Sequence, residues 1–193
     1  MYKLCKTEQS ANRQHELEAG LLAAMTSHRY EEISVSDLCD QLGVPRKSFY
    51  RYFSSKDGAL QALLDHTLME YESFPLNTAP GEKRTVQKEL ERFFQFWIRK
   101  KSLLDVLERN NLSGILIERS IAYALSGAPV PQRFFAQDAK EVRDQVTTFM
   151  VCGLMSMILG WHHAGYPHSP QHMSAMAVRL VSQPLFPNVG ELI

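Results

Sequence analysis

Basic and aromatic side chains gather in one short stretch of the chain, residues 44–56, which reads VPRKSFYRYFSSK. Its four basic residues are Arg46, Lys47, Arg51 and Lys56, and it contains no acidic residue. Arginine can bind guanine through two hydrogen bonds, and lysine, serine and tyrosine can donate to phosphates or base edges. This combination of side chains predicts contact with double-stranded DNA.

Two short helices joined by a tight turn are the elements that would present this stretch. Ser34 followed by Asp37 is typical of a helix start, and apolar residues at helical spacing follow it. Gly43 suits the left-handed position that ends a helix, and Pro45 can open the next one. The pattern predicts a helix-turn-helix, in which the second helix lies in the major groove.

The order and spacing of several short motifs point further. They are Ser34-Val35, Leu38-Cys39, Gly43-Val44, Ser48-Phe49-Tyr50, Tyr52-Phe53 and Ser55-Lys56-Asp57. In these motifs, residues 11–65 resemble the DNA-binding domain of the TetR family of bacterial transcriptional regulators. There are two departures: Pro45 replaces the usual serine cap, and Lys47 stands where the family prefers glycine or alanine.

The resemblance implies that Tyr50 and Lys56 contact phosphates and that Arg46, Lys47 and Arg51 lie near the groove. The predicted DNA-binding residues are Ser34, Ser36, Pro45, Arg46, Lys47, Ser48, Tyr50, Arg51, Tyr52 and Lys56. Phe49 and Phe53 are expected in the core, where phenylalanine usually lies. The alternative is that all the aromatic residues of this stretch are core and the basic ones form a solvated helix face.

Helical periodicity runs through the whole chain, and no segment alternates with period two, so an all-α fold is expected. The expected architecture is an N-terminal three-helix helix-turn-helix domain followed by a larger C-terminal helical ligand-binding and dimerisation domain. The expected divisions are residues 1–55 for the DNA-binding domain, 56–81 for a connecting helix and loop, and 82–193 for the regulatory and dimerisation domain. Ser169 and Pro170 are expected to start the last helix.

TetR-family regulators dimerise through their last two long helices, and this chain has two such segments, residues 142–163 and 169–182. A two-fold dimer places two recognition helices about 34–36 Å apart, which suits a near-palindromic operator. The candidate interface residues are Met150, Gly153, Leu154, Met157, Trp161, Met173, Met176 and Leu180. The alternative for each is the core of a single protomer, because methionine fills cores as readily as interfaces.

An effector pocket in the C-terminal domain is a further expectation from the resemblance. Its candidate lining residues are Phe93, Phe94, Trp97, Tyr123, Phe134 and Phe135, with ordinary core packing as the alternative. Glu118 or Arg119 could anchor a polar ligand, although a helix-surface position is favoured. Histidines crowd residues 162–172, but without cysteine partners we expect no metal there and no cofactor.

Composition bounds the remaining possibilities. The 193 residues carry 21 basic and 21 acidic side chains, and the zero net charge conceals the basic stretch and a run of five acids over residues 57–82. Catalytic motifs such as GxSxG, HExxH and phosphate loops are absent, which argues against an enzyme. We expect a cytoplasmic, homodimeric regulator without membrane contact, most simply a repressor that responds to an effector. The alternative is an activator whose C-terminal domain binds a partner protein.

Overall fold

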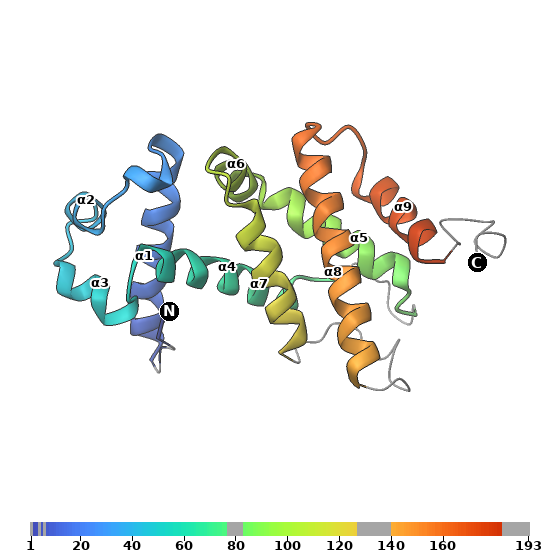
Figure 1. The fold of residues 1–193 in the computed structure, drawn as a ribbon, viewed down its shortest axis with the longest axis horizontal. Coiled ribbons are helices and arrows are strands. Elements are labelled where there is room, and N and C mark those ends of the chain that lie inside the picture. The colour runs from blue at the N-terminus through green and yellow to red at the C-terminus, as the bar shows by residue number, and fades with distance from the viewer. Residues whose placement is uncertain (1, 4, 6, 77–82, 127–139, 183–193) are drawn as a thin grey trace.

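The computed structural model describes residues 2–3, 5, 7–76, 83–126 and 140–182, and these residues are almost entirely helical (Figure 1). The elements are α1 Glu8–Ser27, the 3-10 turn η1 Tyr30–Glu32, α2 Val35–Gln41, α3 Arg46–Tyr52, α4 Lys56–Ser73, α5 Val86–Arg99, α6 Lys101–Arg109, α7 Ser113–Leu125, α8 Lys140–His163 and α9 Pro170–Ser182. Within the described ranges, extended pairing is limited to one isolated bridge, between Tyr2 and Phe53. The all-α prediction is confirmed.

Hydroxyl side chains start many of the helices. Thr7, Ser55 and Thr85 each accept a hydrogen bond from the backbone N–H three residues later, at 3.1–3.3 Å. Each such bond satisfies one of the four amides that a helix leaves free at its start. The predicted start of the last helix is confirmed: Ser169 Oγ accepts from an α9 amide at 3.2 Å, and α9 begins at Pro170.

The first three helices form a unit at one end of the molecule, and α4 leads from it to α7 in the middle (Figure 1). Helix α1 packs against α2 and α4, and α2 packs against α3. The core of this unit consists of side chains no more than 1% exposed: Leu17, Leu21, Met25, Leu38, Phe49, Phe53, Leu60 and Leu64. The expected burial of Phe49 and Phe53 is confirmed, and each such side chain contributes about 1.5–3 kcal/mol.

Helices α5 to α9 form the second body, in which α5 packs along α9 and α7 packs along α8. Aromatic side chains of α5 supply much of its core, because Phe94, Phe96 and Trp97 are all buried. The ring of Phe94 meets that of Trp161 from α8 edge to face, with centroids 5.7 Å apart. Edge-to-face pairs of this kind add about 0.5–1.5 kcal/mol beyond the area they bury.

Helix α4 contacts both bodies, since it packs against α1 and against α7. The buried carboxylate of Asp65 accepts from Arg119 of α7 at 2.7 Å and 2.5 Å, and from the Tyr2 hydroxyl at 2.8 Å. Arg119 is therefore paired across the helices and does not lie free as a ligand anchor. The proposed division at residues 55 and 81 stays a prediction.

Helix α8 is long and apolar enough to cross a membrane by length and composition, with a mean hydropathy of 1.2 over its most apolar window. One helix of this kind is weak evidence for a membrane, since core helices of soluble proteins have the same composition. Only 11% of that window is buried within the chain, and Phe149 is 71% exposed. The exposed apolar face of α8 therefore calls for another surface to cover it.

Candidate nucleic-acid interface

The turn between α2 and α3 is set by a glycine. Gly43 has a φ of +62°, the left-handed conformation that costs other residues energy. Val44 N donates to Cys39 O at 2.9 Å, and Gly43 N donates to Asp40 O at 3.2 Å. These two bonds form a Schellman motif, which ends α2 and redirects the chain into α3. The predicted helix-turn-helix is present.

The starts of the two helices also follow the sequence expectations. Ser34 Oγ accepts from the Asp37 amide at 3.1 Å and donates to the Asp37 carboxylate at 2.6 Å. Pro45 is the N-cap of α3 and makes no side-chain capping bond, as its replacement of serine predicts. Ser36 is half-buried in the first turn of α2, whereas Ser34 is exposed.

The outer face of α3 carries the predicted basic side chains. Arg46, Lys47 and Arg51 are exposed, and no hydrogen bond or ion pair ties any of them to another residue in the described part of the chain. Tyr50 is 52% exposed between them. A shallow hollow on this face is lined by Pro45, Lys47, Ser48, Tyr50 and Arg51. Three cations and a phenol on one free helix face are suited to phosphates and base edges.

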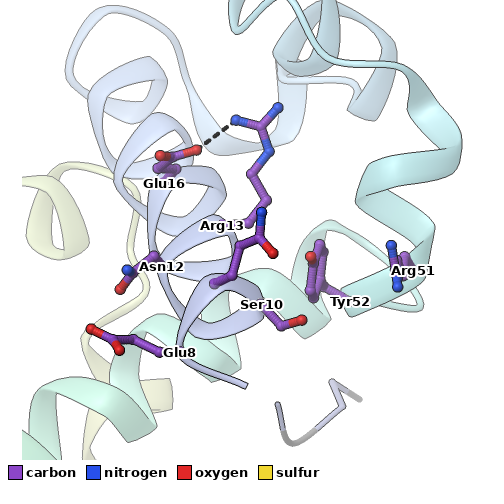
Figure 2. A pocket seen from close by; sticks show the side chains of 8 residues that line it. Glu8, Ser10, Asn12, Arg13, Glu16, Arg51 and Tyr52 are labelled. Carbon is purple, nitrogen blue, oxygen red and sulfur yellow. Dashed lines mark hydrogen bonds and ion pairs between the residues drawn. The ribbon is translucent and has the colours of Figure 1, made fainter. Parts of the chain in front are cut away.

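A second hollow lies between the start of α1 and the end of α3, and Arg51 and Tyr52 line one side of it (Figure 2). Glu8 and Glu16 also line it, and Glu16 pairs with Arg13 at 2.5 Å. The mixed charges distinguish this hollow from the purely basic outer face of α3.

Tyr52 departs from the prediction that it contacts DNA. Its side chain is only 7% exposed, and its ring lies against Phe53 with centroids 6.3 Å apart. The reason is helical spacing, because Tyr52 follows Phe49 by three residues and shares its inward face. The alternative reading of Tyr52 as a core aromatic is the one that fits.

Lys56 also departs from its predicted place. Its ammonium donates to Ile33 O at 2.7 Å and to Tyr30 O, and lies 4.3 Å from the centre of the Tyr30 ring. Burial lowers the pKa of Lys56, although nearby Asp57 and Glu31 oppose that shift. The side chain ties the start of α4 to η1, so the phosphate contact implied by the resemblance would require these bonds to break.

The candidate interface residues divide by burial. Trp161 and Met173 are 3% and 4% exposed, so they belong to the protomer's own core and their assignment to an interface was wrong. Met150, Leu154, Met157 and Met176 are half-buried, and Gly153 and Leu180 are exposed. The sequence reasoning missed Phe149, which at 71% is the most exposed large apolar side chain among the described residues. Its helical spacing to Gly153 and Met157 did not distinguish it from the other apolar residues of α8.

The candidate effector residues divide in the same way. Phe94 and Trp97 are 0% and 1% exposed and pack as core, so they line no open cavity. Phe93 and Tyr123 are half-buried. Phe134 and Phe135 lie outside the described residues. The core alternative is thus the correct one for Phe94 and Trp97.

The histidines of residues 162–172 form two separate groups. His162 Nε2 lies 3.1 Å from Glu108 of α6, and His163 Nδ1 lies 2.6 Å from the same carboxylate. His168 and His172 stack on each other, with ring centroids 4.4 Å apart. The first group joins α6 to α8, which is a structural task.

Comparison with known sequences gives one family and one relative. The model of the family "bacterial regulatory proteins, tetR family" matches residues 21–63. The HTH-type transcriptional regulator EthR of Mycolicibacterium smegmatis (strain ATCC 700084 / mc(2)155) is 32% identical over 85 residues, 40% of this chain. That match spans 39% of the relative's own length.

Comparison with solved structures extends over most of the chain. The fatty acid degradation regulator FadR from Bacillus halodurans aligns with a TM-score of 0.58 and 12% identity, covering 94% of this chain and 98% of that one. The TetR family repressor AlkX from Dietzia sp. strain DQ12-45-1b aligns with a TM-score of 0.54 and 16% identity, covering 85% of this chain and 90% of that one. The dihydroxyacetone kinase operon activator DhaS aligns with a TM-score of 0.55 and 16% identity, covering 88% of this chain and 93% of that one. At these identities the likeness is one of fold.

Proposed function

Because the chain belongs to the TetR family of bacterial regulatory proteins, we propose that it is a repressor that binds a near-palindromic operator as a homodimer and releases it when an effector binds. The observation that carries the proposal is the outer face of α3. There Arg46, Lys47 and Arg51 are exposed without partners among the described residues. Repression needs only that the dimer cover its operator, whereas activation also needs a surface for a partner protein.

The electrostatics of this face give the affinity a definite salt dependence. With Lys56 occupied by backbone carbonyls, each protomer offers three cations, and a dimer offers six. Each neutralised phosphate contributes about −0.9 to the slope of log affinity against log salt, so we expect a slope of about −5.

Dimerisation is proposed through the exposed faces of α8 and α9. Phe149 of α8 is 71% exposed and Leu180 of α9 is 47% exposed, and exposing large apolar side chains to water is unfavourable. A Cβ added at Gly153 or Gly160 would meet no atom of the described residues within 4 Å, apart from the backbone of α8 itself. Glycines on such a face allow the backbone of a second helix to approach closely.

The effector is proposed to act at the carboxyl end of α4. The ring of Phe93 meets Tyr71 of α4 edge to face, with centroids 6.0 Å apart, and the Tyr123 hydroxyl donates to Glu72 of α4. A ligand that contacts Phe93 and Tyr123 would alter their contacts with α4, and α4 also packs against α1. It would thereby favour one spacing of the two recognition helices over another.

DNA binding is tested with the full-length protein and a pool of random duplexes from which bound sequences are selected. Arg46→Ala should reduce discrimination between the selected site and random duplex by about 1–3 kcal/mol. Lys101→Ala, which removes an exposed cation on α6, is the matched control and should leave it unchanged. Equal discrimination in wild type and Arg46→Ala would reject this use of α3.

The dimer is tested by sedimentation equilibrium at micromolar concentration. Phe149→Glu should convert the dimer to a monomer, whereas Met69→Glu alters a 47% exposed apolar residue on α4 and should not. A wild-type monomer would reject the dimer, and a dimer that survives Phe149→Glu would reject this interface.

Native mass spectrometry of the freshly expressed protein then separates a small bound effector from a partner protein by the added mass.

A further inference from the structure

Three potential metal ligands meet between α1 and α4. Glu18 Oε2 lies 3.2 Å from Nδ1 of His15, one helical turn away, and 2.9 Å from Nδ1 of His66 on α4. All three donor groups lie within 4.8 Å of one another, and the two imidazole rings have centroids 4.6 Å apart. The packing of the helices thus gathers two imidazoles around one carboxylate.

The carboxylate at the centre of this group is buried and incompletely satisfied. Glu18 is 2% exposed, and its Oε1 atom is buried without a hydrogen-bond partner among the described residues. The buried Nε2 of Gln14 likewise has no partner in the described part of the chain, and the Gln14 oxygen accepts from Cys5 Sγ at 2.8 Å. A buried carboxylate oxygen without a donor is unfavourable unless a cation or another donor reaches it.

The donor set is the one that zinc-class ions bind. Two histidines and one glutamate leave the fourth tetrahedral position open to water. With bonds of about 2.0–2.1 Å, neighbouring ligand atoms of a tetrahedral site lie about 3.3 Å apart, close to the 2.9 Å and 3.2 Å observed. His15 has 54% of its side chain exposed, so an ion has a path in from solvent and the ring has room to rotate.

We propose that His15, Glu18 and His66 form a binding site for a divalent transition-metal ion of the zinc class, which clamps α1 to α4. The bound ion accepts electron pairs from one nitrogen of each imidazole and from Glu18 Oε2, and its positive charge compensates the negative charge of the buried carboxylate. The spacing of His15 and Glu18 is visible in the sequence, but His66 lies 48 residues further on and only the packing of α4 brings it there.

The test uses the full-length protein freed of metal with a chelator and titrated with Zn²⁺ or Co²⁺ alone. Calorimetry should give one strong site per chain, and Co²⁺ should show the intense visible bands of tetrahedral coordination. His15→Ala should weaken binding by more than about 10-fold, because loss of a mere outer-shell partner of a metal ligand already costs about 10–100-fold. Because His15 is half-exposed, this variant should fold like the wild type, which circular dichroism checks.

His172→Ala is the control, because it removes a histidine from the stacked pair on the other body and should leave the strong site intact. Zn²⁺ should also raise the melting temperature of wild type and of His172→Ala but not of His15→Ala. Absence of a strong site in the wild type would overturn the proposal. So would equal binding by wild type and His15→Ala, or loss of the site in His172→Ala.

Discussion

Replacing Lys56 by methionine keeps the apolar stem of this side chain and removes its ammonium, which separates a structural role from a DNA contact. The ammonium makes two strong bonds, to the carbonyls of Tyr30 and Ile33, and a weak one to that of Glu31 at 3.5 Å. Bonds to a charged group contribute about 1.5–3 kcal/mol each when they are well buried. Because water reaches the half-exposed Lys56 and replaces part of them, we expect a loss of about 2 kcal/mol, roughly a 30-fold change in the unfolding constant.

The assay pairs urea denaturation with a salt series of DNA binding at one protein concentration, and Lys47→Met is the matched variant. Lys47 is exposed on α3, so its replacement should leave stability unchanged and make the salt slope shallower by about 1.8 for the two copies in a dimer. Lys56→Met should do the reverse: it should lower the midpoint of urea denaturation and leave the salt slope of DNA binding unchanged. The reasoning is refuted if Lys56→Met unfolds like the wild type and changes the slope as much as Lys47→Met does.

Three other changes test other parts of the fold. Gly43→Ala should lower the free energy of unfolding by about 1–2 kcal/mol, because a φ of +62° strains any residue with a side chain, although a Cβ there would meet no described residue beyond its chain neighbours within 4 Å. An unchanged melting temperature would contradict this. Asp65→Asn should cost about 2 kcal/mol in urea denaturation, since Arg119 loses its charged partner but keeps some contact with water; a variant as stable as the wild type would show that the pair does not hold α4 to α7. Burial raises the pKa of Tyr71 to about 12, whereas the phenol of the unfolded chain titrates near pH 10. Between pH 10 and 12 the unfolded chain therefore loses this proton while the folded chain keeps it. The contribution of the neutral phenol to stability is complete below pH 10 and is lost across this window. Tyr71→Phe should therefore flatten the fall in stability across this window, by at most about 2.7 kcal/mol, and identical profiles from denaturation at pH 8 to 12 would count against the assignment.

Helix α4 gives the proposed switch a physical path. At its start, Tyr30 donates its hydroxyl to Asp57 at 2.6 Å, and its carboxyl end is held by the buried Arg92, which donates to Phe74 O at 2.7 Å and lies 4.5 Å from the centre of the Tyr71 ring. Because both ends of α4 are held by contacts, a displacement of its carboxyl end would be transmitted along the helix to its start. The proposed metal site acts on the same helix, because His66 lies in its middle.

The helix-turn-helix was predictable from sequence because its determinants are local. Gly43 takes the left-handed conformation at the turn, Ser34 caps the helix that begins beside it, and Pro45 caps the next without a hydroxyl bond. Each of these preferences depends on a residue and its neighbours within a few positions. The free basic face of α3 followed from the same local pattern, since Phe49 and Phe53 fix which side turns inward.

The tertiary structure decided what the spacing of residues leaves open. Apolar periodicity identifies a helix face but does not say whether the same chain covers it, so Trp161 turned out to be core while Phe149 stands exposed. In the same way, the sequence gives the charge of a basic residue in a DNA-binding motif, but only the fold decides which groups that residue contacts. Lys56 donates to carbonyls 23 to 26 residues before it, because the fold places the start of α4 beside η1. Glu18 meets His66, 48 residues after it, because packing α4 against α1 buries this carboxylate and only its new neighbours can replace the lost water.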